Sequence, residues 1–79
     1  MNEYLGSIKL TAAGFVSKDY LECNEQLLSI SENQALYALL GNKFGGNINN
    51  NNFALPNLTP PNENLKYIIC VEGVFPQMP

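Results

Sequence analysis

Histidine, arginine and tryptophan are absent from this chain of 79 residues. Without histidine, the chain by itself supplies neither a Ser–His nor a Cys–His pair to activate a nucleophile. It also lacks the commonest metal ligand and has only two cysteines. The acidic residues are scattered and form no paired-carboxylate motif: Glu3, Asp19, Glu22, Glu25, Glu32, Glu63 and Glu72. These absences predict a protein that is not an enzyme and that binds neither a metal nor another cofactor.

Charge of either sign is scarce, since only 14% of the residues are charged and the net charge is −3. A nucleic-acid-binding protein needs a basic patch, and a helix on a membrane surface is typically rich in lysine and arginine. The lysines form no such run: Lys9, Lys18, Lys43 and Lys66. We therefore expect no nucleic-acid partner.

Long apolar runs are also missing, and none approaches the roughly 20 residues that a transmembrane helix needs. The N-terminal segment "MNEYLGSIKL" lacks the basic start and apolar stretch of a signal peptide. We expect synthesis in the cytoplasm without a signal peptide, and no membrane insertion.

The two cysteines, Cys23 and Cys70, are too few for a disulfide framework. Both lie among apolar neighbours in strand-like segments, which favours free, buried thiols. A disulfide between them is the alternative.

Apolar residues, by contrast, make up 46% of the chain, which argues against disorder. A chain of this length forms at most one domain, over residues 1–79, and its core rarely supplies more than roughly 3–5 kcal/mol. Small chains often gain further stability from association. We therefore expect the protein to bind copies of itself.

Two patterns near the N-terminus predict strands. Residues 4–13 alternate Ile8, Leu10 and Ala12 with polar residues, which is typical of a half-buried strand. The segments "YLEC" and "LLSI", joined by "NEQ", are expected to form a small hairpin.

A helix is predicted over residues 31–40. In "SENQ", Ser31 and Gln34 are spaced as a capping box, and Gly41 is placed as the C-terminal cap. The apolar stripe that packs the helix on the core contains Ala35, Leu36, Leu39 and Leu40.

The segments after this helix alternate between polar and apolar. "GGNINNNN" is expected to be a turning loop, in which the amides of Asn49, Asn50, Asn51 and Asn52 are candidate glycan contacts. "FALPNL" is expected to lie on the core as an extended plug outside any strand ladder. Residues 67–71 are apolar on both faces and predict a central strand. The fold class is thus α+β, mostly β with one short helix.

Four segments in order resemble the phage tail collar domain family: "YLGSIKLTAAGF", "YLECNEQLLSISENQALYALLGNKFGG", "FALPNL" and "YIICVEGVFP". Short relatives that resemble microcystin-dependent protein carry "CNGQ", "QNQALF", "FALPDL" and "NYIIALQGIFP" at the matching places. In this chain Glu25 replaces the glycine of "CNGQ" and Asn57 replaces the aspartate of "LPDL". Only "TPPNEN" stands where long tail-fibre relatives carry a receptor-binding insertion.

The resemblance implies a small collar-type fold in a non-enzymatic, trimer-forming structural protein of a phage tail fibre or phage-derived appendage. Such a protein would support attachment, as part of a virion tail or an extracellular appendage. Its expected partners are its own copies, other tail fibre proteins and cell-surface glycan. The candidate subunit contacts are Tyr37, Phe44, Phe53, Leu55 and Phe75. The alternatives are a subunit of a self-assembling extracellular filament, and a small monomeric glycan-binding module.

Overall fold

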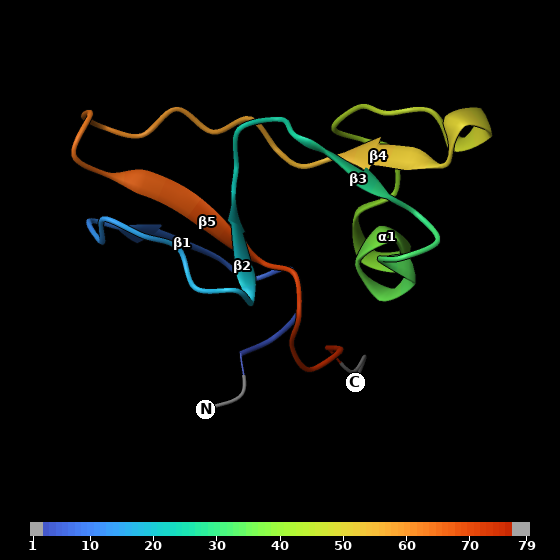
Figure 1. Cartoon of the computed structure of the whole chain (residues 1–79), viewed down its shortest axis with the longest axis horizontal. Coiled ribbons are helices and arrows are strands. Elements are labelled where there is room, and N and C mark those ends of the chain that lie inside the picture. The colour runs from blue at the N-terminus through green and yellow to red at the C-terminus, as the bar shows by residue number, and fades with distance from the viewer. Residues whose placement is uncertain (1–2, 77–79) are drawn as a thin grey trace.

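The computed structural model describes residues 3–76, which form two small sheets and one α-helix (Figure 1). The elements are β1 (Ile8–Thr11), β2 (Tyr20–Glu22), β3 (Leu27–Ser29), α1 (Gln34–Leu40), a 3₁₀ turn η1 (Ile48–Asn50), β4 (Asn52–Ala54) and β5 (Lys66–Cys70). Three strands form one antiparallel sheet in the order β1-β5-β2, and β3 pairs with β4 in a second sheet. The α+β, mostly β fold is as predicted.

β5 is the central strand of the larger sheet, as its sequence predicted, and both of its faces are covered. On one face Ile69 is fully buried in the main core. On the other face Ile68 and Cys70 pack with Tyr20 in a second, smaller cluster. Burial on both sides explains why this strand shows an apolar run without alternation.

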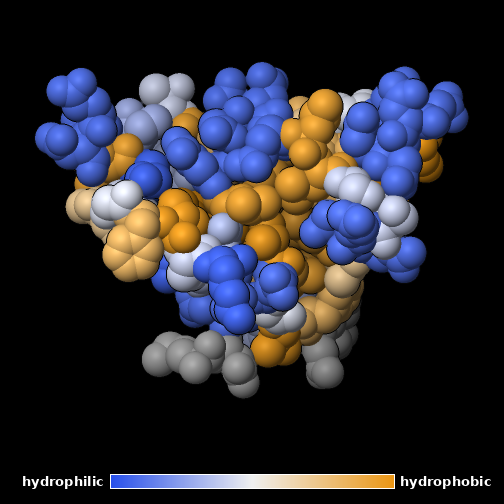
Figure 2. All heavy atoms as spheres, in the orientation of Figure 1, coloured by the Kyte–Doolittle hydropathy of each residue, from blue (hydrophilic) through white to orange (hydrophobic). Residues whose placement is uncertain are grey.

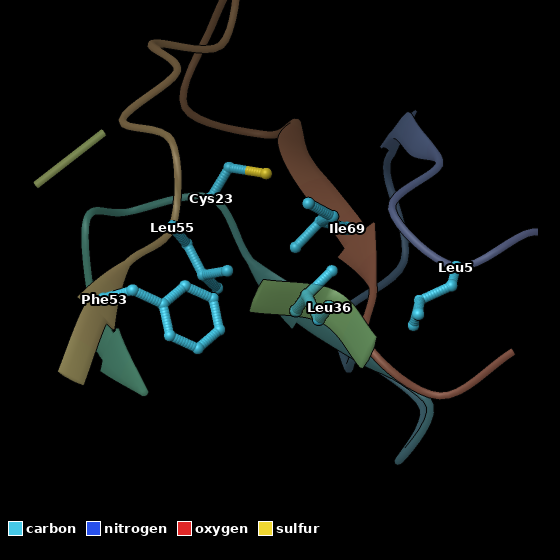
Figure 3. Packing of buried hydrophobic residues seen from close by; sticks show 6 residues of the cluster. All are labelled: Leu5, Cys23, Leu36, Phe53, Leu55 and Ile69. Atoms are coloured by element: carbon cyan, nitrogen blue, oxygen red, sulfur yellow. The ribbon is translucent and has the colours of Figure 1, made fainter. Parts of the chain in front are cut away.

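The main core joins the two sheets and the helix (Figure 3). Leu36 comes from α1, and Ile69 from β5. The other buried members of this cluster are Leu5, Cys23, Phe53 and Leu55. In Figure 3 these side chains point toward one another from segments far apart in sequence. Because each segment is too short to be stable alone, the fold depends on this convergence.

The predicted hairpin between "YLEC" and "LLSI" is wrong. β2 pairs with β5, whereas β3 pairs with β4, so the chain crosses from one sheet to the other between them. Glu25 lies in this crossing with φ at 69°, a backbone conformation that favours glycine. The chain therefore leaves β2 at a turn that starts a different pairing.

The predicted helix start was wrong by three residues, because α1 begins at Gln34. No side chain caps it, and the Ser31 hydroxyl instead lies 3.0 Å from the Ser29 hydroxyl and accepts a hydrogen bond from the Asn51 amide. Tertiary partners thus replace the local capping box. Leu36 is buried, whereas Ala35 is exposed.

The "FALPNL" segment is a strand in part, which corrects the predicted plug. Its first residues form β4, and the backbone of Asn57 continues the pairing with a bridge to Asn24. Between these points Leu55 N–H donates to the Gln26 carbonyl. Residues 52–57 therefore run beside residues 24–29 over most of their length.

The predicted burial of the β1 face is also wrong. Ile8 and Leu10 are each 42% exposed, and Ala12 is exposed as well. Ile8 pairs with Ile69 and Leu10 with Tyr67, so both lie on the core face of the sheet. They lie at its outer strand, beyond the buried cluster that covers Ile69.

Candidate functional site

Exposed apolar side chains are the most prominent surface feature of the chain. Figure 2 shows apolar atoms across the middle of one face, with polar side chains on the outlying loops. Within residues 3–76 the exposed large hydrophobic residues are Tyr4, Ile8, Leu10, Phe15, Leu27, Phe44, Ile48, Leu58, Val74 and Phe75. Surfaces this apolar usually mark places where another molecule binds.

One group of these residues lies where the two ends of the described chain meet. Tyr4 and Val74 form a parallel β-bridge, reinforced by hydrogen bonds from Leu5 N–H to the Val74 carbonyl and from Val74 N–H to the Glu3 carbonyl. A shallow hollow of about 390 Å³ lies here, lined by Tyr4, Val74, Phe75 and Pro76. Its lining side chains are aromatic or aliphatic, and the hollow is open to solvent.

The five candidate contact residues fall in different environments. Phe53 and Leu55 are completely buried within the chain, so neither has surface to offer another subunit. Tyr37 is half-buried, with its ring packed edge-on against Phe53 at 5.3 Å between centroids. Phe44 and Phe75 are 39% and 47% exposed and are available for contact.

The asparagine run mostly builds its own loop. The Asn47 side chain accepts from Asn49 N–H, and the Asn52 side chain accepts from Asn47 N–H. Asn51 adopts a positive φ of 60°, accepts from Ser31 N–H and donates to the Ser31 hydroxyl. Of the four candidate glycan contacts, Asn49 and Asn50 are the exposed ones whose amides make no hydrogen bond within residues 3–76.

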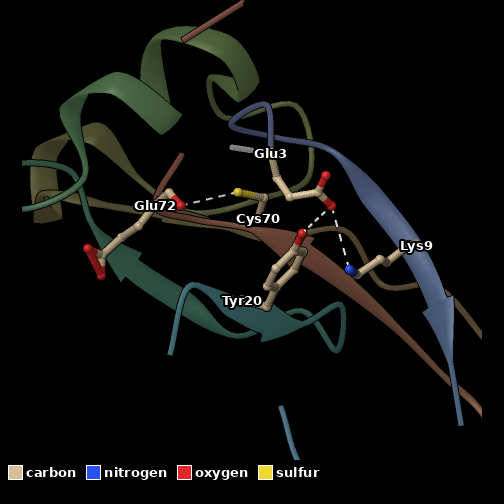
Figure 4. A network of polar contacts seen from close by, with 5 residues as sticks. All are labelled: Glu3, Lys9, Tyr20, Cys70 and Glu72. Atoms are coloured by element: carbon tan, nitrogen blue, oxygen red, sulfur yellow. Dashed lines mark hydrogen bonds and ion pairs between the residues drawn. The ribbon is translucent and has the colours of Figure 1, made fainter. Parts of the chain in front are cut away.

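A polar network covers the face of the sheet opposite the main core (Figure 4). The Tyr20 hydroxyl donates to Glu3 at 2.5 Å, and the Lys9 ammonium lies 3.5 Å from the same carboxylate oxygen. The ammonium also lies over the Tyr20 ring, 4.5 Å from its centroid. The hydrogen bond from Tyr20, aided by Lys9, lowers the pKa of Glu3, and the same bond raises the pKa of Tyr20.

Both cysteines are free and buried, the interpretation that the sequence favoured. Burial raises the pKa of each thiol, and Cys70 also donates to the Glu72 carbonyl at 3.4 Å. Low reactivity follows, because the thiolate is the reactive form. Cys70 lines a hollow of about 200 Å³ together with Glu3, Asp19, Tyr20, Glu72, Gly73 and Val74. Within residues 3–76 no cluster of metal-ligating side chains occurs.

The Phage Tail Collar Domain profile matches residues 6–60, which include β1 through β4 and the helix. The chain belongs to the phage tail collar domain family. This family is a structural one, and membership indicates a structural role in a phage tail fibre. No curated protein matches the sequence. None of the helices in the described part of this collar chain is long and apolar enough to cross a membrane.

The backbone conformation of Glu25 fits the sequence pattern of the family. The resemblance placed a glycine where this collar chain has Glu25, and the positive φ of Glu25 explains why glycine suits that position. Sequence reasoning missed the exposure of Ile8 and Leu10, since an alternating strand was taken as half-buried. The shortness of the chain could have indicated this exposure, because a small core has few segments with which to cover the first strand.

Proposed function

We propose that this collar chain is a self-associating structural protein of a phage tail fibre, assembled as a homotrimer that supports attachment. The observation that carries the proposal is the exposure of many large apolar side chains on so small a domain. Burial of such side chains between subunits stabilises association by about 25 cal/mol per Å² of apolar area removed from water. A virion tail location fits the family.

The surface that suits the trimer contact is the hollow where the two ends of the described chain meet. Tyr4, Val74 and Phe75 expose between 42% and 60% of their surface there. Aromatic side chains are enriched in subunit contacts because they bury large areas at low entropic cost. Phe44 adds a third exposed aromatic residue. Tyr4 and Val74 thus replace the buried Phe53 and Leu55 in the proposed interface, while Phe44 and Phe75 are kept.

Mass measurement in solution tests the proposal, combined with negative-stain imaging. We expect a closed species built from trimers, with a mass of three chains or a multiple of three, which Phe75→Ser disperses into smaller species. Ser17→Ala is a matched control, because it changes an exposed residue outside this hollow. Fibres of indefinite length would support the extracellular filament instead. A monodisperse monomer at micromolar concentration would contradict both forms of assembly.

Binding to a glycan array separates the remaining alternative from assembly. Of the four candidate asparagines, only Asn49 and Asn50 have side-chain amides without a hydrogen bond within residues 3–76, so we do not favour glycan recognition as the main function. Specific binding that Asn49→Ala and Asn50→Ala together abolish would reverse this preference.

A further inference from the structure

The sheet edges differ in how well the chain covers them. On β4, Asn52 N–H donates to the Asn47 carbonyl and Ala54 N–H donates to the Gly45 carbonyl, so the loop before the strand closes its outer edge. On β2, Tyr20 N–H donates to the Ser17 carbonyl. The Glu22 carbonyl accepts from Asn24 N–H and from the Gln26 side chain. Both edges are thus occupied by local segments.

The edge of β3 is partly occupied. The Ser29 carbonyl accepts from the Asn33 side chain at 2.9 Å, which removes one of the acceptors that an added strand would use. Leu27 remains 58% exposed. This strand has three residues and offers a short, incomplete edge.

β1 presents the open edge. Gly6 N–H donates to the Cys70 carbonyl and Cys70 N–H donates to the Ser7 carbonyl, a bulge that fixes the phase of the ladder. In an antiparallel pair the hydrogen-bonded residues alternate, so Lys9 faces β5 and the backbones of Ile8 and Leu10 face outward. Within residues 3–76 no other backbone or side chain bonds these outward groups.

The side chains of this edge do not protect it. Natural edge strands are often blunted by a charged residue, especially lysine, that repels an incoming strand. The one lysine on β1, Lys9, is instead paired with Glu3 and packed on the Tyr20 ring (Figure 4). Ile8 and Leu10 leave 42% of their surface exposed beside it. The exposed charge of Lys9 is therefore paired with Glu3, and the other side chains of β1 carry no charge.

We infer that β1 is a strand-addition site whose occupant is β1 of a second copy of this chain, in antiparallel orientation. The edge is self-complementary, and Glu3 partly offsets the charge of Lys9, its one charged residue. Hydrogen-bonded pairing of Leu10 with Leu10 of the second copy sets Ile8 opposite Ala12 and Lys9 opposite Thr11. A register centred on Lys9 would place two lysines directly opposite each other, which is unfavourable.

This pairing joins the two larger sheets into one sheet with six strands. The exposed Ile8 and Leu10 of both copies then lie in one apolar strip, on the same face as Tyr67 and Ile69. The contact is two-fold and uses residues apart from the hollow of the proposed trimer. A trimer that also pairs in this way contains six chains, and a chain without the trimer contact forms a dimer.

A pair of proline variants tests the site through the mass of the assembly. In Leu10→Pro the lost N–H faces outward, so the ladder with β5 stays intact while an added strand loses its donor and meets the ring. Glu22→Pro is the matched control, since its N–H faces the outer edge of β2. We expect Leu10→Pro to halve the mass of the largest species and Glu22→Pro to leave it unchanged.

A cross-linking experiment reads the same contact without proline. Leu10→Cys places two thiols across the two-fold axis, where Cα atoms of a hydrogen-bonded pair lie about 5.5 Å apart, within disulfide range. Both native thiols are buried and should stay silent. We expect rapid oxidation to a covalent dimer for Leu10→Cys. Phe15→Cys, although 78% exposed in the native residue, should cross-link far more slowly.

The outcomes of the proline and trimer experiments are separable. Trimers that persist unchanged in Leu10→Pro, with no covalent dimer from Leu10→Cys, would overturn strand pairing and leave the proposed function standing. A wild-type dimer that Leu10→Pro converts to monomer would support strand pairing and contradict the trimer. Equal rates of cross-linking for Leu10→Cys and Phe15→Cys would overturn the pairing of β1 with β1. Disulfides that form only when Leu10→Cys is mixed with Leu27→Cys would instead make β3 of a second copy the occupant.

Discussion

The two outer strands of the three-stranded sheet share one central strand, yet their edges differ. The segments on either side of β2 return to it: Ser17 accepts from its first outward N–H, and Asn24 and Gln26 donate to its last outward carbonyl. The segments flanking β1 run elsewhere, and its outward groups at Ile8 and Leu10 have no partner within residues 3–76. The difference lies in the flanking turns, because both strands pair with β5 in the same antiparallel manner.

Charge follows the same division. Both outer strands carry an exposed charged residue, but Lys9 on β1 is paired with Glu3 and lies over the Tyr20 ring, whereas Glu22 on β2 takes part in no ion pair within residues 3–76. The edge of β2 thus has local hydrogen bonds and an unpaired charge, whereas on β1 the outward backbone groups are open and the charge of Lys9 is paired. An isolated domain gains nothing from an apolar open edge, but an assembling one does. The comparison supports a protein whose surface is completed by its own copies.

The largest expected effect comes from breaking the strand on which both edges depend. Ile69 is fully buried in β5, so Ile69→Ala should lower the free energy of unfolding by about 2–5 kcal/mol. Ile8→Ala is the matched control, because Ile8 is the cross-strand partner of Ile69 and is 42% exposed. Urea denaturation should show the larger loss for Ile69→Ala, and equal losses would contradict the difference in burial.

A second test acts on the junction that precedes β1. A Cβ added at Gly73 would lie 2.4 Å from the Glu3 carbonyl oxygen and 2.7 Å from the Cys70 sulfur. Gly73→Ala should therefore destabilise the fold by about 1–3 kcal/mol through overpacking. Gly14→Ala meets no atom within 4 Å and should change little. Thermal unfolding compares the two, and an unchanged midpoint for Gly73→Ala would show that this junction yields freely.

The turn that follows β2 contains a residue with a strained backbone, Glu25. Glu25 holds a φ of 69° next to β2, a conformation that costs a residue with a side chain about 1 kcal/mol relative to glycine. Glu25→Gly should raise the free energy of unfolding by about this amount. Glu32→Gly is the control, since Glu32 is exposed and lacks a positive φ, and it should not stabilise. Equal responses of the two variants in urea would refute the strain at Glu25.

The smallest expected effect concerns the polar network in which Glu3 pairs with Lys9 of the open edge. Because the pKa of Glu3 is lowered in the folded chain, its contribution to stability is present above the ordinary glutamate pKa of about 4.3. That contribution is lost as the pH falls through the lowered pKa. Glu3→Gln should remove this part of the pH dependence of stability. It should also weaken self-association at neutral pH, because the Lys9 ammonium then lacks its carboxylate partner.

Urea denaturation at several pH values measures the stability effect of Glu3→Gln, and sedimentation at the same pH values measures its effect on self-association. Lys66→Gln is the control, since Lys66 lies on β5 and takes part in no ion pair within residues 3–76. A wild-type pH profile retained in Glu3→Gln would show that Glu3 does not control the edge.

Local patterns predicted several elements because short-range physics decides them. The apolar run at 67–71 became the central strand, and Gly41 ended the helix with a φ of 60°. Patterns failed where distant partners compete with local ones. Ser31 bonds Asn51 across the fold and leaves the helix uncapped, and "LLSI" pairs with "NFA" in preference to its neighbour "YLEC".

The surface was less predictable than the core. Phe53 and Leu55 were expected at a subunit contact because they are large and apolar, which does not distinguish a core residue from an interface residue. The asparagines were expected to be available to glycan, yet Asn51 and Asn52 hold the loop together. Exposure depends on what the rest of the chain covers, so it could be decided only in the folded structure.

The sequence alone determined the chemistry that this collar chain lacks, its order of segments and its membership in a structural family. Those properties depend on which residues are present and in what order. The tertiary structure decided which sheet edge stays open and that Lys9 packs on the Tyr20 ring. Both depend on how separate segments of the chain are brought together. An antiparallel ladder directs alternate backbone groups outward, and only the fold shows whether anything meets them.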